Sequence, residues 1–485
     1  MGVKLSDTLA ALLNQRFTNG ALPNDILLEI FKSHLDQSLH FQYSWLTLAH
    51  VCRRWRHVIF ASPRYLDLQV VCTTSNPVRD MMMTRSGWPA LPIAILLSGN
   101  HKRMFKSVVA GVDNVIATAL EHNALVFDIK LHDVQSWQLE RFAAAMQIPF
   151  PELTSLDISA ADKNNYLPSP PVLPDSFLGG SAPRLQTLRL DGIPFRRLVT
   201  KLLLSSHNLV DIELWDISFK YFGAEEMATC LSPMKRLRSL HIKMKSTWHR
   251  PPSAGQHPPS FTCIVLPALT SLKIHSSKGF LDNLVSRLDV PLLEKMEIWI
   301  LEDRVYSSEL PRFISRIEAF KTSDQVNIHI RDTGIQLVFS SQNSSVTSAE
   351  LTLTEPMDYP STLSFCSSLP PLSHLKCLTL REHQCPAWDW DLLENTSLHE
   401  IFDSFTAVRN VFISKNLAEN VSSCMGEDED SEEEETTEML PALQNIFVEE
   451  LQRQSEYFQQ NIQRFIAAKR LAGQPVNLRH WEVDG

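Results

Sequence analysis

A short pattern of apolar side chains recurs along most of this chain and constrains its fold more than any other feature. Each copy places apolar residues at its first, fourth and sixth positions. The starts of the first six clear copies are 32, 24, 28, 32 and 24 residues apart, and the last two intervals are 33 and 35. Alternation within each copy predicts a short strand, and the spacing predicts stacked units that bury their apolar faces only against one another. The copies begin at Leu153, Leu185, Leu209, Leu237, Leu269, Leu293, Leu375, Val408 and Leu443.

This pattern resembles that of leucine-rich repeats. The 82-residue gap between Leu293 and Leu375 has room for two degraded copies, at 326–330 and 351–353, and 124–129 fits an irregular first copy. The repeats depart from the family pattern eight residues after each first leucine, where asparagine or cysteine is usual. We therefore expect an irregular solenoid without an asparagine ladder, and an α/β domain with strands repeated by chance is the alternative. The residues at that position are Ala161, Ile193, Ile217, Lys245, Ser277, Leu301 and His383.

Residues 22–60 carry a different pattern, typical of helices. Leu22 and Pro23 open a stretch in which Ile26, Leu27, Ile30 and Phe31 recur at helical spacing. Proline suits the first turn of a helix, where its missing N–H is not needed. A second helix is expected across residues 46–59. The spacing alone fits any small helical domain. The apolar side of that second helix would hold Leu46, Leu48, Val51, Cys52, Trp55 and Ile59.

The whole string is more specific than its spacing. L-P-x-D-I-L-x-E-I-F, then L-x-x-V-C-R-x-W and S-P-R, resembles the F-box, although residues 32–44 are longer than in the shortest members. The resemblance implies three packed helices that dock on the adaptor subunit of SCF-type cullin ubiquitin ligases. A helix end at 85–87 followed by a strand at 92–97 resembles a large group of fungal F-box proteins. The implied adaptor contacts are Leu22, Pro23, Ile26, Leu27, Ile30, Phe31, Val51, Cys52 and Trp55.

These patterns predict an α/β chain, with a three-helix F-box followed by an irregular leucine-rich-repeat solenoid. We expect a leading amphipathic helix at 1–20, the F-box at 21–66 and a linking strand and helix segment at 67–120. The repeats would span 121–448, and a capping helix with a tail would span 449–485. Loops rich in proline at about 162–183 and 246–260, and an acidic one at 422–439, are expected to be poorly ordered.

Side chains that lie between the apolar residues of each strand should point away from the core. They combine charge with a few aromatic rings, which is the composition of protein-binding surfaces. The alternative is that flanking loops cover the tryptophans as ordinary core. The predicted target-binding residues are Arg189, Trp215, His241, Lys243, Lys273 and Trp299.

Other functions find little support. The formal net charge is −10, and nine acids lie within 427–438, so the rest of the chain is nearly neutral and has no basic footprint for nucleic acid. We expect no catalytic residues, no metal and no cofactor, because no phosphate-binding, zinc or hydrolase motif is found. No apolar stretch is long enough to span a membrane. The eight scattered cysteines fit reduced thiols in the cytoplasm or nucleus.

The expected function is recognition without bond chemistry. The F-box would bind the ligase adaptor subunit, and through it a cullin, while the repeats bind an unknown protein target. Two rivals stay open: an F-box scaffold with a non-degradative assembly role, and an enzyme whose site lies on the open face of the sheet. The identity of the target, its need for phosphorylation, the continuity of the solenoid and any role of residues 427–438 are not settled by the sequence.

Overall fold

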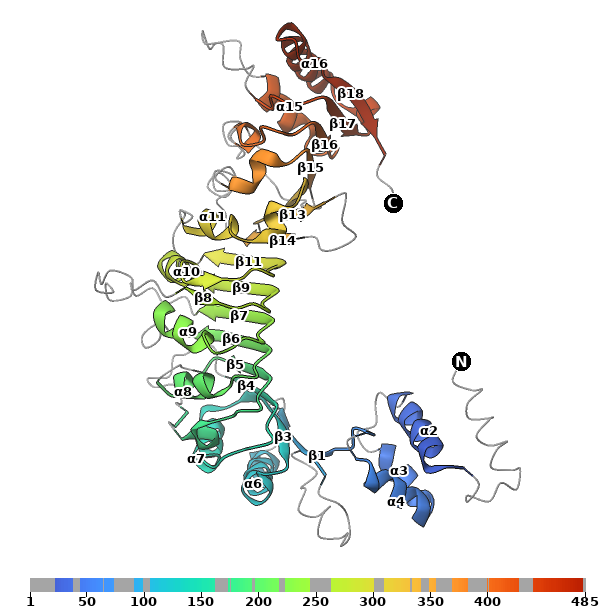
Figure 1. The fold of residues 1–485 in the computed structure, drawn as a ribbon, viewed down its shortest axis with the longest axis vertical. Helices are drawn as coiled ribbons and strands as arrows, with labels where there is room; N and C mark the ends of the chain where they lie inside the picture. Colours follow the sequence, from blue (N-terminus) through green and yellow to red (C-terminus); the bar gives the residue numbers. More distant parts are fainter. Residues whose placement is uncertain are drawn as a thin grey trace. The chain divides into compact units, whose positions relative to one another are not determined.

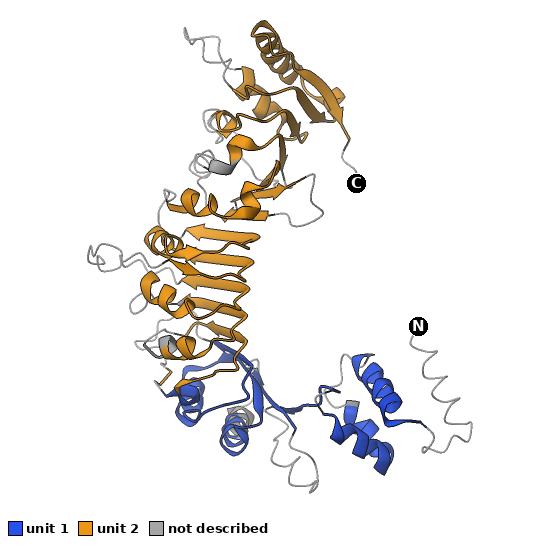
Figure 2. Ribbon diagram, viewed as in Figure 1, with its two compact units in different colours: residues 1–161, 176–179 blue, residues 162–175, 180–485 orange. Residues whose placement is uncertain are grey.

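The computed structural model describes residues 22–37, 44–63, 65–73, 91–98, 105–161, 173–174, 176–193, 197–217, 223–244, 263–300, 309–331, 334–341, 349–354, 369–382, 399, 401–426 and 439–482. The chain forms two compact units (Figure 2). Unit 1 comprises residues 1–161 with 176–179, and unit 2 comprises 162–175 with 180–485. The helices expected at 1–20 and around 78–86 lie outside the described residues, as do the loop expected at 246–260 and the acidic residues 427–438.

Unit 1 begins with a head of three helices, α2 (Asn24–Gln37), α3 (Ser44–Val51) and α4 (Arg53–Ala61). The single helix expected across residues 46–59 is wrong, because Cys52 separates α3 from α4. Its backbone is extended (φ −157°, ψ 170°), and its thiol accepts a hydrogen bond from the Trp55 N–H at 3.5 Å. Cys52 therefore caps α4 in the way that serine usually does.

The remainder of unit 1 is a parallel sheet with two helices. The strands β1 (Val70–Cys72), β2 (Ile93–Ser98), β3 (Val126–Val134) and β4 (Ser155–Ala160) pair in chain order. Helices α6 (Phe105–His122) and α7 (Ser136–Ala145) connect β2 to β3 and β3 to β4. The strands expected at 92–97 and 124–129 are present as β2 and β3. A tight turn at Phe177–Gly180, in which Leu178 and Gly179 have left-handed backbone angles, buries Phe177 and Leu178, so this part of the predicted loop at 162–183 is packed core.

Unit 2 confirms the stacked strands and their alternation. Parallel strands β5 to β11 follow each other in register, and the leucines that open the repeat copies, such as Leu209 and Leu237, are fully buried. Helices α8, α9 and α10 form a second stack beside them (Figure 1). The strands are β5 (Thr187–Asp191), β6 (Asp211–Ile217), β7 (Ser239–Met244), β9 (Ser271–Ser276) and β11 (Lys295–Ile300); the helices are α8 (Arg197–Ser205), α9 (Ala224–Leu231) and α10 (Lys278–Val285). A short parallel pair, β8 (Ile264–Val265) and β10 (Leu288–Asp289), lies apart from this sheet.

The next three strands break the simple succession. Strands β12 (Gln325–Arg331) and β14 (Ala349–Thr354) occupy the two degraded copies, but β13 (Gly334–Ser340) between them is antiparallel to both and was not predicted. The order in space is β11-β14-β13-β12-β15, so the chain passes over two positions and returns through two hairpins. Helices α11 (Glu309–Ile314) and α12 (Glu318–Lys321) form the connection from β11 to β12.

The last strands, β15 (Cys377–Glu382), β16 (Asn410–Ile413), β17 (Asn445–Glu449) and β18 (Asn477–Trp481), are parallel again. A short row of asparagines links β16, β17 and β18, at a strand position other than the one where the family's asparagine ladder was expected to be missing. Asn445 donates to Asn410 at 2.9 Å, and Asn477 donates to Asn445 at 3.3 Å. Helices α15 (Ala418–Gly426) and α16 (Glu456–Leu471) pack together, so residues 422–426 are helix and not loop.

Candidate protein-binding surfaces

Several apolar side chains of the three-helix head are exposed. Leu22 is 44% exposed, Ile26 47% and Val51 52%. Pro23 is also exposed, and three further residues of the predicted adaptor contact are partly exposed, namely Ile30, Cys52 and Trp55. Apolar side chains left in water on a small domain are characteristic of a partner surface.

Two of the predicted adaptor contacts instead lie in the core of the head. Leu27 is 3% exposed and Phe31 is fully buried. The Phe31 ring meets the Trp55 ring edge-on, with centroids 4.8 Å apart. Both residues belong to the apolar helical spacing of α2, and that spacing reflects the packing of α2 on α4. The exposed residues of the set implied by the resemblance remain the predicted adaptor contact.

Polar contacts fix the ends of the head. The Arg54 guanidinium donates to the Leu22 carbonyl and, at 2.9 Å, to the Asn24 side chain, so α4 holds the chain where it enters α2. The Tyr65 hydroxyl donates to Glu29, and this hydrogen bond raises the pKa of Tyr65. The exposed apolar side chains thus sit on helices held in place at both ends.

A second surface is the exposed face of β5 to β11, where all six predicted target-binding residues are found. Register places Arg189 beside Glu213, Glu213 beside His241, and His241 beside Lys273. Trp215 lies beside Lys243, and both face away from the buried core. Both predicted tryptophans, Trp215 and Trp299, are partly exposed, and neither is buried by a covering loop.

Four rings cross this face in a line that we call the Trp–His row: Trp215, His241, His275 and Trp299. Successive ring centroids are 5.2, 5.4 and 5.2 Å apart. His275 completes the row and was absent from the predicted set, because lateral stacking depends on register between repeats of unequal length. The Arg189 guanidinium lies 4.7 Å from the Trp215 ring centroid, and the Lys243 ammonium 5.9 Å.

Neighbouring side chains shift the pKa values of two ionisable groups on this face. Burial, with nearby His275 and Lys273, lowers the pKa of His241 to about 4, so this ring is neutral at pH 7. Hydrogen bonding with His275 and Lys273 lowers the pKa of Glu297 to about 2. Lys273 lies 2.7 Å from Glu297, and Arg189 lies 3.4 Å from Glu213. The face therefore presents paired charges beside an aromatic row in which His241 is neutral.

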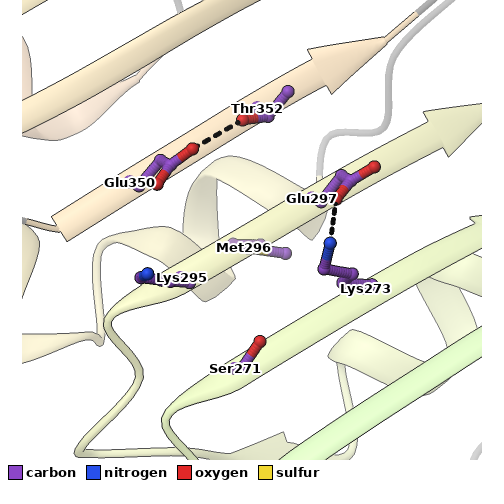
Figure 3. A pocket seen from close by; sticks show the side chains of 7 residues that line it. All are labelled: Ser271, Lys273, Lys295, Met296, Glu297, Glu350 and Thr352. Atoms are coloured by element: carbon purple, nitrogen blue, oxygen red, sulfur yellow. Dashed lines mark hydrogen bonds and ion pairs between the residues drawn. The ribbon is translucent and has the colours of Figure 1, made fainter. Parts of the chain in front are cut away.

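A hollow of about 180 Å³ opens beside this row, over β9, β11 and β14 (Figure 3). Its size suits one side chain of a partner. Lys295 lines it and is exposed, while Glu350 accepts hydrogen bonds from Gln336 and Thr352. The lining residues are Ser271, Lys273, Lys295, Met296, Glu297, Glu350 and Thr352.

This arrangement suits recognition. Tryptophan and arginine contribute most of the energy at protein interfaces, because they bury a large area with an oriented polar group. Among the described residues, no group of three or more His, Cys, Asp or Glu side chains is placed to hold a metal ion. The histidine–carboxylate pairs His132–Asp157 and His399–Asp403 are partly exposed hydrogen-bonded pairs.

Sequence reasoning missed a third cluster on β15 to β18, the arginine–aromatic platform, made of Arg381, Phe412, Phe447, Arg479 and Trp481. The Phe412 and Phe447 rings stack with centroids 4.4 Å apart, and Trp481 meets Phe412 at 5.4 Å. Arg381, Phe412 and Phe447 alternate with buried residues as expected, whereas Arg479 and Trp481 follow no clear repeat copy.

Comparison with known proteins supports the head. The F-box-like family model matches residues 20–65. This match does not reach residues 85–97, on which the resemblance to fungal F-box proteins rests. No curated protein matches the chain. Among solved structures, the leucine-rich repeat-containing protein LegL7 from Legionella pneumophila is 14% identical, over 82% of this chain and 97% of its own. The TM-score of that alignment is 0.25, so the assignment of the repeats rests on the strands themselves.

In the part of the chain that the structure describes, no helix has both the length and the apolar character needed to cross a bilayer.

Proposed function

We propose that this chain is the substrate-recognition subunit of an SCF-type ubiquitin ligase. The observation that carries the proposal is an F-box-like head, at residues 20–65, that exposes Leu22, Ile26 and Val51. F-box domains generally bind the adaptor subunit of such ligases. The chain itself would perform no bond chemistry, and through the adaptor it would join a cullin.

The exposed face of β5 to β11 supports the second half of the proposal. A target held there would be kept near the ubiquitin-charged partner, which raises the effective concentration of its lysines. The Trp–His row with Arg189, Lys243 and Lys273 forms the proposed target contact. The same proposal locates the protein in the cytoplasm or the nucleus. The six cysteines of the described residues are all free thiols, which is consistent with that location.

Binding of the purified adaptor subunit tests the head. The variant Ile26→Asp/Val51→Asp should lose about 30-fold or more in affinity, because each change places a charge in an apolar contact. Leu292→Asp is the matched control, since Leu292 is 58% exposed but lies in unit 2. Equal adaptor binding by wild type and the double variant, with circular dichroism unchanged, would refute the proposed adaptor contact.

Target recognition is tested separately. Proteins whose lifetime lengthens when the gene is deleted should stay long-lived when Trp215→Ala/Trp299→Ala replaces the wild type. The same variant should still bind the adaptor. Targets bound but not turned over would instead favour the scaffold with an assembly role.

A further inference from the structure

The platform on β15 to β18 offers a binding surface that the proposed function does not use. Phe412 and Phe447 are directly opposite in register, and their rings are stacked nearly parallel, at an interplanar angle of 6°. Trp481 approaches Phe412 edge-on at 69°. All three are partly exposed. Three rings from three neighbouring strands thus form one surface beside solvent.

Two guanidinium groups converge on these rings. That of Arg381 lies 5.0 Å from the Trp481 ring centroid, and that of Arg479 lies 5.9 Å from the Phe447 centroid. Within the described residues, neither arginine pairs with a carboxylate, in contrast with Arg189 and Lys273 on the Trp–His row.

The nearby carboxylates are engaged elsewhere. Glu449 accepts a hydrogen bond from the Lys415 backbone N–H at 3.1 Å, and Glu450 pairs with Lys415 and Arg453. Glu382, next to Arg381, interacts with Asn416, and burial raises the pKa of Glu382. The platform is therefore aromatic with two cations whose charge is not neutralised locally.

A guanidinium stacked on a ring is already oriented for an anion. Ring contact uses its flat face, whereas its N–H donors lie in the plane and match the two oxygens of a carboxylate. Such charge-assisted pairs are about twice as strong as neutral hydrogen bonds. The chemistry that fits two such groups is a pair of carboxylates.

The backbone beside the platform indicates how those carboxylates would be presented. Strand β18 is the last in the strand order and pairs with β17 on one side, so its other edge is unpaired within the described residues (Figure 1). An extended segment that joins a sheet edge gains main-chain hydrogen bonds and sends alternate side chains to one face. Arg479 and Trp481 are themselves two residues apart on β18.

We propose that the free edge of β18 and the arginine–aromatic platform bind an extended acidic segment of a partner protein. Its carboxylate side chains are two residues apart, with one meeting Arg479 and the next meeting Arg381 above Trp481. This site is separate from the Trp–His row, and the proposal does not depend on the F-box.

Fluorescence polarisation with the full-length chain tests this site. The probe is a labelled seven-residue peptide of valines with glutamate at the third and fifth positions. We expect saturable binding, and about tenfold weaker binding for each of Arg381→Gln and Arg479→Gln, because each removes one charge-assisted pair. Arg236→Gln is the matched control, since Arg236 is exposed on another part of unit 2. A peptide with glutamine in place of both glutamates should bind the wild type weakly. Its affinity should be about that of the glutamate peptide for the Arg381→Gln/Arg479→Gln variant.

Three outcomes would overturn the proposal. One is equal binding of the glutamate and glutamine peptides. Another is unchanged binding by the Arg381→Gln/Arg479→Gln variant, with its thermal unfolding midpoint like that of wild type. The third concerns the edge: N-methylation of alternate peptide amides on the side facing β18 should abolish binding, and full binding by that peptide would show that no strand is added.

Discussion

The ammonium nitrogen of Lys273 lies 2.7 Å from the Glu297 carboxylate, and the two residues are directly opposite each other on the parallel strands β9 and β11. His275, two residues beyond Lys273, reaches the other carboxylate oxygen at 3.6 Å. The Glu297 carboxylate thus lies between two side chains, and these contacts lower its pKa to about 2.

Glu297→Gln should destabilise unit 2 by about 1–2 kcal/mol at pH 7, after solvent screening is allowed for. Because the folded-state pKa of Glu297 is lowered, its contribution is complete above its ordinary pKa of about 4.5 and is lost as pH falls towards 2. Urea unfolding of both proteins between pH 7 and pH 3 should show the difference narrowing below pH 4.5. A difference that does not change with pH would rule out this linkage.

His241→Phe should flatten the pH dependence of stability between about pH 6.5 and pH 4. His241 has a lowered pKa, so the unfolded chain takes up its proton first and acid destabilises the fold across this window. We expect the wild type to lose about 2 kcal/mol more than the variant. Denaturant unfolding measures this loss, with His207→Phe as an exposed control. Equal slopes for all three proteins would contradict the lowered pKa.

Gly179→Ala should destabilise unit 1 by about 2–3 kcal/mol. Gly179 has φ +68°, and a methyl group there would lie 2.9 Å from Pro149. Gly279→Ala is the matched control, because its methyl group meets no atom within 4 Å and it lies in α10. That change should be neutral or slightly stabilising. The thermal unfolding midpoint distinguishes the two, and equal midpoints would show that the turn at Phe177–Gly180 relaxes.

Lys469→Met should be neutral or stabilise unit 2 by up to about 2 kcal/mol at pH 7. Lys469 is 1% exposed, and burial lowers the pKa of its ammonium group, which lies 3.5 Å from the Leu440 carbonyl and 3.4 Å from the Gln474 side chain. The gain should shrink as pH rises towards the ordinary lysine pKa of about 10.4, where the unfolded chain also loses the proton. A loss of stability in denaturant unfolding at pH 7 would mean that the interactions of the ammonium group outweigh the burial of its charge.

The stack of strands could be predicted because its signal is local. Ile212 and Leu214 face the core of unit 2 by strand alternation alone, and both are fully buried. The same alternation predicts Trp215 and Lys243 on the exposed face, where the structure has them. Residues that share a face can therefore be read from the sequence, since a period of two needs no knowledge of neighbouring strands.

Features that depend on contacts between distant segments could not be predicted. His275 joins the Trp–His row because β7, β9 and β11 align in one register, although their repeats differ in length. Phe31, an adaptor contact implied by the resemblance, packs on Trp55 of α4, and an apolar helix face looks the same in sequence whether it meets another helix or another protein. Trp481 joins the platform because β18 pairs with β17, and the sequence of β18 contains no clear copy of the repeat pattern.

The reversed order of β12, β13 and β14 has a consequence for how unit 2 is made. In a simple stack each new strand covers the edge of the one before it as the chain is synthesised. Here β11 acquires its neighbour β14 only after residue 354, and β12 has no adjacent strand when it first emerges. The edge of β11 that β14 covers therefore stays without that partner during synthesis until both hairpins have formed, and an unpaired edge is where a nascent chain can pair with another strand.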